Sequence, residues 1–363
     1  MDTNTSANSK RKRIFYLDQL KTISIFLIIL IHVTSISLIK SPTHYLYMGA
    51  IYDNIARVGV PIFIMVSGAL LLNREYKTLN FLKKRFKRIL IPATLWCIIY
   101  AIYTFISGNN EGVTPNLTSI TSTIQYIINM FLGQTGYLQH YWFIWMILSV
   151  YLVAPIINKW IKNSNIKEVK IILIIWLITC IFTTFSLPYI NIDLRYFAGP
   201  LGYFILGYYL HNTKDKIIEN KKLWPILFII ATIIKGIIIY YNLPTVEIFS
   251  SQKTYYYDLL TVFQATGMYL TIKNISFNSQ TKENINNFMS KKPLGFLNHS
   301  LSSYTFGIYL ANLLILRIIN PLFILNHAFI YTPIVSLLIL FLTWIILLIL
   351  NKIPIIKKLS GTI

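Results

Sequence analysis

Residues 16–39 form one apolar run, YLDQLKTISIFLIILIHVTSISLI, which is long enough to cross a lipid bilayer as an α-helix. The run nevertheless contains Asp18 and Lys21 near its start and His32 well inside it. Ionisable side chains in a spanning helix are costly, so each is a candidate functional group. Helical geometry places Lys21 and His32 on nearly the same face, about 16 Å apart along the axis. The first span therefore brings an imidazole into the membrane interior, as a functional group or as a structural residue between packed helices.

The composition indicates an all-α polytopic membrane protein. Of the 363 residues, 55% are hydrophobic and only 12% are charged, and apolar runs of about 20 residues recur along the chain. The strands of a membrane β-barrel would alternate in polarity, and these runs do not. Cys97 and Cys180 lie within apolar runs in no metal-binding or redox spacing, and no zinc, haem or nucleotide-loop motif occurs. We therefore expect no metal cofactor.

The Lys and Arg residues lie in short clusters between the apolar runs and give the chain a net charge of +21. Such clusters are typical of cytoplasmic loops beside anionic membrane lipids, and they argue against binding of nucleic acid. The segment at 73–88 carries seven Lys or Arg residues, whereas 108–138 carries none. We predict about ten transmembrane helices with both termini cytoplasmic, at residues 17–39, 52–72, 89–107, 139–158, 168–187, 194–211, 223–241, 255–273, 301–319 and 329–350.

We divide the chain into a basic cytoplasmic segment at 1–13, a transmembrane domain at 14–352 and a cytoplasmic tail at 353–363. The apolar run after the basic segment is too long for a cleaved signal peptide and lacks a small-residue cleavage site. We therefore expect it to remain as the first span. The outer loop at 108–138 includes TSITSTIQYIINMFLG, which can form a short helix on the membrane surface.

The second predicted span begins DNIARVGVPIFIMVSGALLL and contains Arg57 about one turn inside its outer end. The first two spans run in opposite directions through a short connection, so His32 and Arg57 fall at similar depths on neighbouring helices. Arg57 can bind an anionic or carbonyl oxygen or tune His32, although an arginine here can also reach the outer headgroups. Pro61 predicts a kink, and the Ser67-Gly68 pair predicts a close helix contact near the inner end.

A further pair of candidates follows in the basic segment that ends KKRFKRILIP. Arg85 and Arg88 are three residues apart, so on a helix they share a face. Two guanidinium groups so placed can bind phosphates through forked hydrogen bonds, which suggests a phosphate-bearing cofactor on the cytoplasmic side. The alternative is an ordinary basic cluster attracted to anionic lipid.

Polar residues also gather at the outer ends of later spans. QHYWFIWMILSVYLVAP contains His140 and Trp142, and IDLRYFAGPLGYFILGYYL contains Arg195. Aromatic residues at a membrane interface are normally anchors, but His and Arg are more informative there. We expect a polar substrate-binding cavity that opens outward, opposite a cofactor site that opens inward.

Together these segments resemble the acyltransferase family 3 membrane proteins over nearly the whole membrane region. Within that family they are similar to surface-polysaccharide O-acyltransferases such as the enterobacterial common antigen O-acetyltransferase. The strings that carry the resemblance are LDQLKTISIFLIILIH, RVGVPIFIMVSGALL, the Arg85 and Arg88 pair, HYWFIW and SSYTFGIYL. Lys21 stands where the family has arginine and keeps the charge without the planar fork. Asn312 stands where the family commonly has histidine, and its amide can hydrogen-bond but cannot titrate.

The resemblance implies an integral-membrane O-acyltransferase, specifically an O-acetyltransferase, that takes its acyl group from cytoplasmic acetyl-CoA. Arg85 and Arg88 would bind the phosphates of this donor, with Ser67 nearby. Lys21 would help to position the donor. Membrane lipid would surround the protein, and we expect no metal to take part in the reaction.

The same resemblance assigns the chemistry to the outer half of the membrane. His32 would act as general base on the acceptor hydroxyl, or would itself carry the acyl group, and Arg57 would stabilise the oxyanion of the tetrahedral intermediate. The acceptor would be a cell-surface polysaccharide or a lipid-linked sugar at a bacterial plasma membrane, contacted by His140, Trp142 and Arg195.

Two other functions fit the same topology. A transporter or flippase for a polysaccharide intermediate would also use His and Arg inside the membrane. A non-catalytic sensor built on the same scaffold would bind a ligand without turnover. Consumption of acyl-CoA distinguishes an acyltransferase from both.

Overall fold

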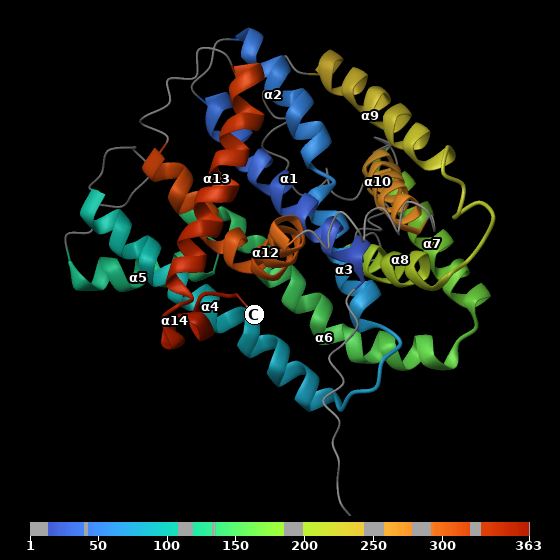
Figure 1. Cartoon of the computed structure of the whole chain (residues 1–363), viewed down its shortest axis with the longest axis horizontal. Helices are drawn as coiled ribbons and strands as arrows, with labels where there is room; N and C mark the ends of the chain where they lie inside the picture. The colour runs from blue at the N-terminus through green and yellow to red at the C-terminus, as the bar shows by residue number, and fades with distance from the viewer. Residues whose placement is uncertain are drawn as a thin grey trace, which may run out of the picture.

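The computed structural model describes residues 14–39, 43–107, 119–132, 134, 136–184, 199–242, 258–277, 292–319 and 328–362. Across these residues the regular secondary structure is helical and contains no strand, which confirms the predicted all-α class. The elements are α1 (Phe15–Ile39), α2 (Thr43–Ala56), α3 (Gly59–Leu71), α4 (Thr78–Ser107), α5 (Ile120–Phe131), the 3₁₀ helix η1 (Gly136–Tyr141), α6 (Trp142–Asn163), α7 (Ile166–Thr184), α8 (Pro200–Asn212), α9 (Leu223–Asn242), α10 (Leu259–Phe277), α12 (Lys292–Ile319), α13 (Ala328–Leu350) and α14 (Pro354–Leu359) (Figure 1).

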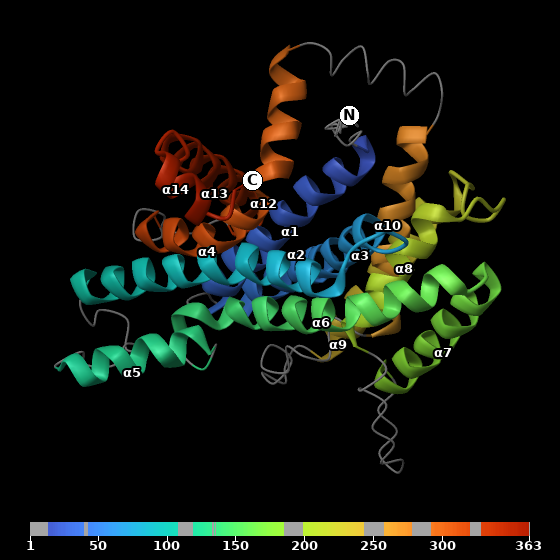
Figure 2. The ribbon, with the colours of Figure 1, turned by 90° about the horizontal axis from the view of Figure 1, so that it is seen from below.

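The first helix, α1, lies in the middle of the molecule and packs against α2, α3, α10, α12 and α13 (Figures 1 and 2). Leu27, Ile28, Ile29 and Leu30 are successive residues that point to all sides of α1, and all four are buried. A helix that is apolar on every side is normally one that is buried on every side. The run that carries His32 is therefore the core of the helix bundle.

Polar contacts establish which helix ends lie together. The N–H of Arg74, after α3, donates to Oδ1 of Asn158 in α6 at 3.2 Å, and Nδ2 of Asn158 donates back to the carbonyl of Arg74 at 2.9 Å. Tyr16, at the start of α1, hydrogen-bonds His211 at the end of α8, and the charge of Arg74 also acts on His211. The starts of α1 and α4 and the ends of α3, α6 and α8 therefore share one end of the bundle.

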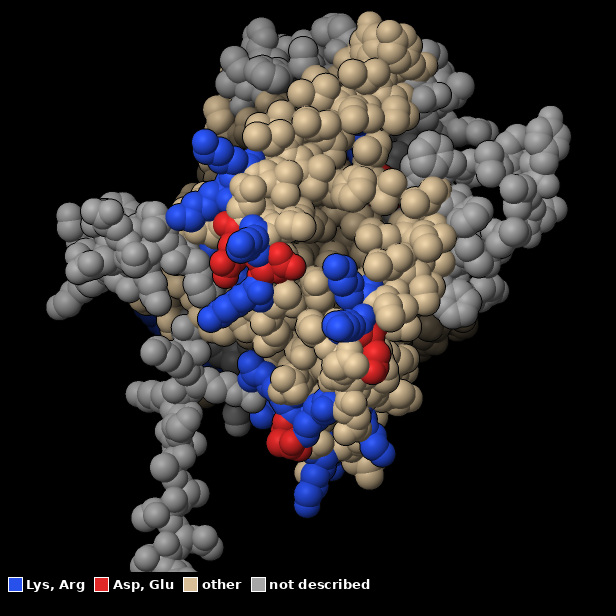
Figure 3. Space-filling view, turned by 90° about the vertical axis from the view of Figure 1, so that its right-hand side faces the viewer, with Lys and Arg blue, Asp and Glu red and all other residues tan. Residues whose placement is uncertain are grey.

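This end, which we call the basic end, carries the positively charged segments at 73–88, 159–170 and 212–222. Figure 3 shows Lys and Arg side chains gathered over one part of a molecular face, next to a broad area without charged side chains. Isoleucines of α9 such as Ile226 and Ile237 are exposed on the surface. An apolar belt beside a basic end is the surface that a membrane-embedded protein presents to lipid.

Seven segments in the described part of the chain are long and apolar enough to cross a membrane, fewer than the ten that the sequence predicts. They are Phe15–Ser35, Gly49–Leu71, Thr78–Ser107, Trp142–Asn163, Leu223–Tyr241, Phe296–Ile319 and Tyr331–Leu350. Helices α7, α8 and α10 occupy the other three predicted positions, but α8 has only 13 residues. A straight span needs roughly 20 residues. The membrane-protein class is thus supported, while the count of ten and the cytoplasmic termini stay predictions.

The second predicted span consists of two helices, α2 and α3, with a break at Arg57 and Val58. Pro61 explains the break, because its ring has no N–H and clashes with the carbonyl four residues earlier, which belongs to Arg57. The helical segment begins earlier than predicted, at Thr43, so Arg57 lies near its middle instead of one turn inside its outer end. In the sequence, the charged Asp53 suggests the end of the span. Asp53 is nevertheless buried, because it pairs with Arg57.

The close helix contact predicted at Ser67-Gly68 is present between α3 and α8. A Cβ atom placed on Gly68 would lie 1.8 Å from the carbonyl oxygen of Phe204, and one on Gly207 would lie 1.9 Å from that of Met65. Glycine at both positions lets the two main chains touch, as small residues do between membrane helices.

The predicted surface helix in the outer loop is α5. Ser119 and Ser122 form a capping box at its start, each side chain bonding the main-chain N–H of the other. The indole N–H of Trp145 in α6 donates to the carbonyl of Phe131 at 3.0 Å, which fixes the far end of α5 against α6.

The segment after α13, which the sequence suggests is a cytoplasmic tail, packs back on the bundle as far as residue 362. Ser360 and Thr362 are buried, and the indole N–H of Trp96 in α4 donates to the carbonyl of Ser360 at 3.4 Å. These residues thus contribute to the packing of α4 and α12.

We predict that Gly207→Ala destabilises the protein by about 1–3 kcal/mol, because the added methyl group must separate α3 from α8. The matched control is Gly236→Ala in α9, where a Cβ would meet its nearest neighbour, Nδ2 of Asn54, at an ordinary 3.5 Å. Thermal unfolding of both variants in detergent measures the difference. Equal unfolding temperatures would contradict the close contact.

Candidate functional site

A cavity of about 410 Å³ lies at the basic end between α1, α3, α4, α6 and α12. Four residues singled out from the sequence, Lys21, Ser67, Arg85 and Arg88, all line this basic-end cavity. They come from three helices, so only the fold brings them together. The other lining residues are Ile14, Leu17, Asp18, Phe63, Leu70, Leu71, Arg74, Ile89, Phe143, Ile147, Tyr151, Ser302, Ser303, Thr305 and Phe306.

The lining of the basic-end cavity is strongly positive. Its charged members are four cations and one carboxylate: Lys21, Arg74, Arg85, Arg88 and Asp18. Nζ of Lys21 lies 3.2 Å from Oδ1 of Asp18, and the hydroxyl of Ser302 donates to the same oxygen at 2.6 Å. Asp18 thus fixes Lys21 and joins α1 to α12. The remaining excess of positive charge suits a ligand that carries several phosphate groups.

Arg85 and Arg88 lie near the start of α4 and face the cavity together, as their spacing predicts. The guanidinium carbon of Arg85 lies 5.5 Å from the ring centre of Phe81 and 5.9 Å from that of Tyr151. These cation–π contacts hold Arg85 between α4 and α6. Arg88 is more exposed than Arg85. Two guanidinium groups at this spacing can bind adjacent phosphates through forked hydrogen bonds.

Arg74 also lines the cavity, although the sequence analysis does not single it out. It follows Asn73, whose φ of 57° is a left-handed conformation that asparagine adopts more readily than most residues. The amide of Asn158 then holds the main chain of Arg74 from α6. The signal in the sequence is the place of Arg74 directly after the second span, at the start of the basic segment.

Deeper in the bundle, Nδ1 of His32 in α1 lies 2.7 Å from Oδ1 of Asn312 in α12. The amide of Asn312 is oriented by its other end, because Nδ2 donates to the carbonyls of Ile308 at 2.9 Å and Tyr309 at 2.7 Å. Its Oδ1 therefore faces the imidazole, and an amide oxygen only accepts hydrogen bonds. Nδ1 of a neutral His32 must carry the proton, which leaves the lone pair on Nε2.

His140, in η1 just before α6, lies beside His32. Their ring centres are 5.8 Å apart in an edge-on arrangement. Tyr309 of α12 donates its hydroxyl proton to the main-chain carbonyl of His140, and the ring centres of these two residues are 5.5 Å apart. The fold thus places His140, which is predicted to bind substrate, next to His32, which is predicted to be catalytic.

Aromatic side chains separate the basic-end cavity from the two imidazoles. The ring centre of Phe143, which lines the cavity, lies 5.8 Å from that of Phe63 and 5.2 Å from that of Tyr309. Phe306, also in the lining, stacks on Tyr309 at 6.2 Å. Tyr309 in turn contacts His140. One layer of aromatic rings therefore lies between the positively charged cavity and His140.

Arg57 is buried and forms an ion pair with Asp53, with Nε and Oδ2 2.9 Å apart. The charge of Arg57 acts on the imidazole of His32. The ion pair fixes the guanidinium group from within α2 and the break that follows it.

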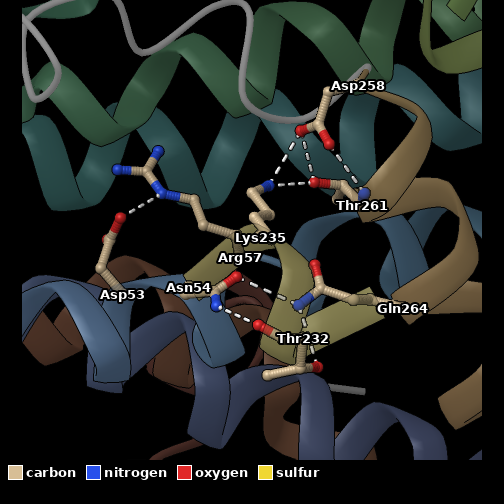
Figure 4. Close-up of polar contacts among 8 residues, drawn as sticks. All are labelled: Asp53, Asn54, Arg57, Thr232, Lys235, Asp258, Thr261 and Gln264. Carbon is tan, nitrogen blue, oxygen red and sulfur yellow. Dashed lines mark hydrogen bonds and ion pairs between the residues drawn. The ribbon is translucent and has the colours of Figure 1, made fainter. Parts of the chain in front are cut away.

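A second buried ion pair joins α9 to the start of α10. Nζ of Lys235 lies 2.8 Å from Oδ2 of Asp258, and Figure 4 shows both directed at the hydroxyl of Thr261. Nearby, Nε2 of Gln264 donates to Oδ1 of Asn54 at 3.1 Å. Lys235 is the one charged residue in the apolar run LWPILFIIATIIKGIIIYYN. A charge in a spanning helix indicates a functional residue, but Lys235 is not among the candidates predicted from the sequence. Its partners are on other helices, so no local pattern reveals them.

Of the two remaining outer-side candidates, the structure describes Trp142. Trp142 begins α6, with its ring centre 6.2 Å from that of Phe143. Arg195 lies outside the described residues. Of the outer-side candidates, His140 is therefore the residue that the structure brings to His32.

These features define a polytopic membrane protein with a cation-lined cavity at one end and, beyond it, a pair of imidazoles of which that of His140 is buried and that of His32 is half-buried. The model of a family described as an acyltransferase domain matches residues 14–350, which is nearly the whole chain. The protein therefore belongs to acyltransferase family 3, as the sequence motifs predict. No curated protein and no solved structure matches the chain.

We predict that Asn312→Leu lowers acyl transfer by about 10- to 100-fold, because His32 loses the partner that orients its ring. In protein with ¹⁵N-labelled histidine rings, NMR should show Nδ1 of His32 protonated in the wild type and a tautomer mixture in the variant. Asn312→Asp, which keeps an acceptor oxygen, is the control and should retain the wild-type tautomer. An unchanged tautomer in Asn312→Leu would show that Asn312 does not set it.

Proposed function

We propose that the protein is an integral-membrane O-acetyltransferase of the surface-polysaccharide type. It transfers the acetyl group of acetyl-CoA from the cytoplasmic side of a bacterial plasma membrane. The acceptor is a hydroxyl of a cell-surface polysaccharide or of a lipid-linked sugar. Family membership supports acyl transfer. The positions of individual residues in the fold support acetyl-CoA as the donor.

The observation that carries the proposal is the convergence of Lys21, Ser67, Arg85 and Arg88 on one cavity. The phosphate groups of acetyl-CoA are its most highly charged part, and this cavity concentrates cations. Arg85 and Arg88 bind phosphate oxygens, and Arg74 adds a further positive charge. Lys21 and Ser67 lie on α1 and α3, the helices that lead from the cavity toward His32.

His32 carries the chemistry in this proposal. Its Nε2 has a lone pair because Asn312 holds the proton on Nδ1, so Nε2 can take the proton of the acceptor hydroxyl or can itself accept the acetyl group. Arg57 supplies positive charge for the oxyanion that develops on the carbonyl. The aromatic layer between cavity and imidazoles keeps water from the thioester.

The acceptor approaches from the side opposite to the basic end. His140, Trp142 and Arg195 contact it there in this proposal. The exposed isoleucines of α9 and the uncharged belt are consistent with an enzyme embedded in the cell membrane and able to meet a lipid-linked acceptor. Neither nucleic acid nor a metal ion has a part in the reaction.

Reconstitution in lipid vesicles tests the proposal. Purified protein receives acetyl-CoA labelled in the acetyl group, with crude envelope glycan as acceptor, and release of free CoA and labelling of glycan are measured. Release that requires protein and glycan supports the transferase. No release with acetyl-CoA or another short acyl-CoA would refute it and favour a transporter of polysaccharide intermediates.

We predict that Arg85→Gln and Arg88→Gln each raise the KM for acetyl-CoA by about 10- to 100-fold, because a hydrogen bond to a charged group contributes about 1.5–3 kcal/mol. Lys84→Gln is the control, since this neighbouring side chain is exposed and does not line the cavity. Steady-state kinetics at varied acetyl-CoA give the values. If Lys84→Gln raised the KM for acetyl-CoA as much, the overall positive charge of the basic end, and not the cavity, would attract the donor.

We predict that His32→Ala lowers kcat by about 10²–10⁴-fold, the range expected for loss of a general base. Binding of acetyl-CoA should persist, because His32 does not line the basic-end cavity. Calorimetric titration with acetyl-CoA, together with turnover in vesicles, separates the two effects. Wild-type turnover in a correctly inserted variant would exclude His32 as the base.

A further inference from the structure

The side chain of His140 combines deep burial with unused hydrogen-bonding capacity. The residue is 5% exposed, and neither Nδ1 nor Nε2 has a hydrogen-bond partner among the described residues. A buried polar group without a partner destabilises the folded protein. Such a group persists where a ligand supplies the missing partner, so the environment of His140 calls for an explanation beyond packing.

The tyrosine hydroxyls around His140 are directed elsewhere. Tyr100 donates its hydroxyl proton to the carbonyl of Leu310 at 3.0 Å, and Tyr141 donates to the carbonyl of Ala93 at 2.8 Å. Three tyrosine rings surround the imidazole edge-on or tilted, those of Tyr100, Tyr141 and Tyr309. They fix the position of the ring through apolar contact and leave its nitrogens for another partner.

The imidazoles of His140 and His32 are close enough to act on one reacting group. Their ring centres are 5.8 Å apart, so a carbonyl oxygen and the hydroxyl oxygen that attacks the same carbon can each lie about 2.8 Å from a nitrogen of a different ring. Nδ1 of His32 is already bound to Asn312. The nitrogen of His32 that remains is Nε2, the same atom that the proposed function requires as base.

We propose that His140 is a second catalytic residue, which donates a hydrogen bond to the carbonyl oxygen of the acyl thioester while His32 acts on the acceptor hydroxyl. This inference rests on the proposed function and adds a group that touches the reacting atoms. The imidazole of His140 thus binds the thioester carbonyl at the place where the acceptor hydroxyl meets it.

The bonds and protons of the step balance with these two residues. Nε2 of His32 takes the hydroxyl proton as the acceptor oxygen bonds to the carbonyl carbon, and the carbonyl π electrons move to the oxygen held by His140. The C–S bond then breaks, and its electron pair leaves with the sulfur of CoA. The proton on His32 passes to that sulfur, which yields the ester, free CoA and both imidazoles in their starting form.

The surrounding charges favour negative charge on the held oxygen. The charge of Arg57 acts on His32, and that of Arg317 acts on His140. Fixed cations near a developing oxyanion stabilise it without reorganisation, and their effect is large where water is excluded. The ion pair with Asp53 holds Arg57 in place, so a direct donor such as His140 complements a charge that acts from a distance.

The position of His140 relative to the basic-end cavity fits a contact with the donor. Phe143, which lines the cavity, follows His140 by three residues, or about one helical turn. A thioester that passes the aromatic layer from the cavity therefore meets His140 first. His32 then lies on the far side of the reacting carbon.

Two substitutions with different hydrogen-bonding capacity test the role of His140. His140→Leu removes the donor, and we expect kcat to fall by about 10²–10³-fold with KM for acetyl-CoA unchanged. His140→Gln keeps a side-chain N–H and should retain clearly more activity than His140→Leu. His211→Gln, which removes a half-buried imidazole at the basic end, is the control for packing. Equal losses in both His140 variants, in parallel with their unfolding temperatures, would overturn the proposal.

A binding measurement separates this inference from the proposed function. In wild-type protein with ¹⁵N-labelled histidine rings, addition of acetyl-CoA should shift the ring resonances of His140, assigned by their absence in His140→Gln. A shift without turnover would refute the acetyltransferase while leaving the contact intact. Turnover without a shift at saturating acetyl-CoA would refute the contact and leave the acetyltransferase intact.

Discussion

The hydrogen bond between His32 and Asn312 is the interaction on which the architecture of the site depends. A polar group in a membrane interior must find its partner within the protein, so an imidazole in the central helix requires a second helix beside it. Helix α12 supplies that partner and, at the basic end, also supplies Ser302 to Asp18. Because α1 and α12 are joined at two depths, the cavity and the imidazoles keep a fixed relation to each other.

The charged and the reactive parts of the site occupy different environments. Phosphate recognition requires cations that remain accessible to water, whereas acyl transfer benefits from a site that excludes it. The basic-end cavity meets the first requirement, and the imidazoles beyond Phe143 and Tyr309 meet the second. In the proposed function, the aromatic layer divides the donor between two surroundings, with its phosphates on one side and its thioester on the other.

Residues that share a helix face could be predicted from the sequence, because helical geometry fixes which side chains lie together. The convergence of Arg85 with Arg88 is of this kind. Contacts between distant segments could not be predicted, and Ser302 is 284 residues from Asp18. The second span was predicted to begin too late, because Asp53 looks like the end of an apolar run. Its ion pair with Arg57 makes it compatible with burial, and such pairing is visible only in three dimensions.

The contact between α3 and α8 has a mechanical consequence for the passage of a substrate. At Gly68 and Gly207 the main chains touch with no side chain between them, so neither helix can slide or rotate without breaking the contact. The wall of the cavity that α3 provides is therefore stationary. Any widening of the aromatic layer must come from rotation of side chains such as Phe143 and Phe306, or from displacement of α6. Helix α3 therefore stays in place, and the groups that can move lie on the opposite side of the passage.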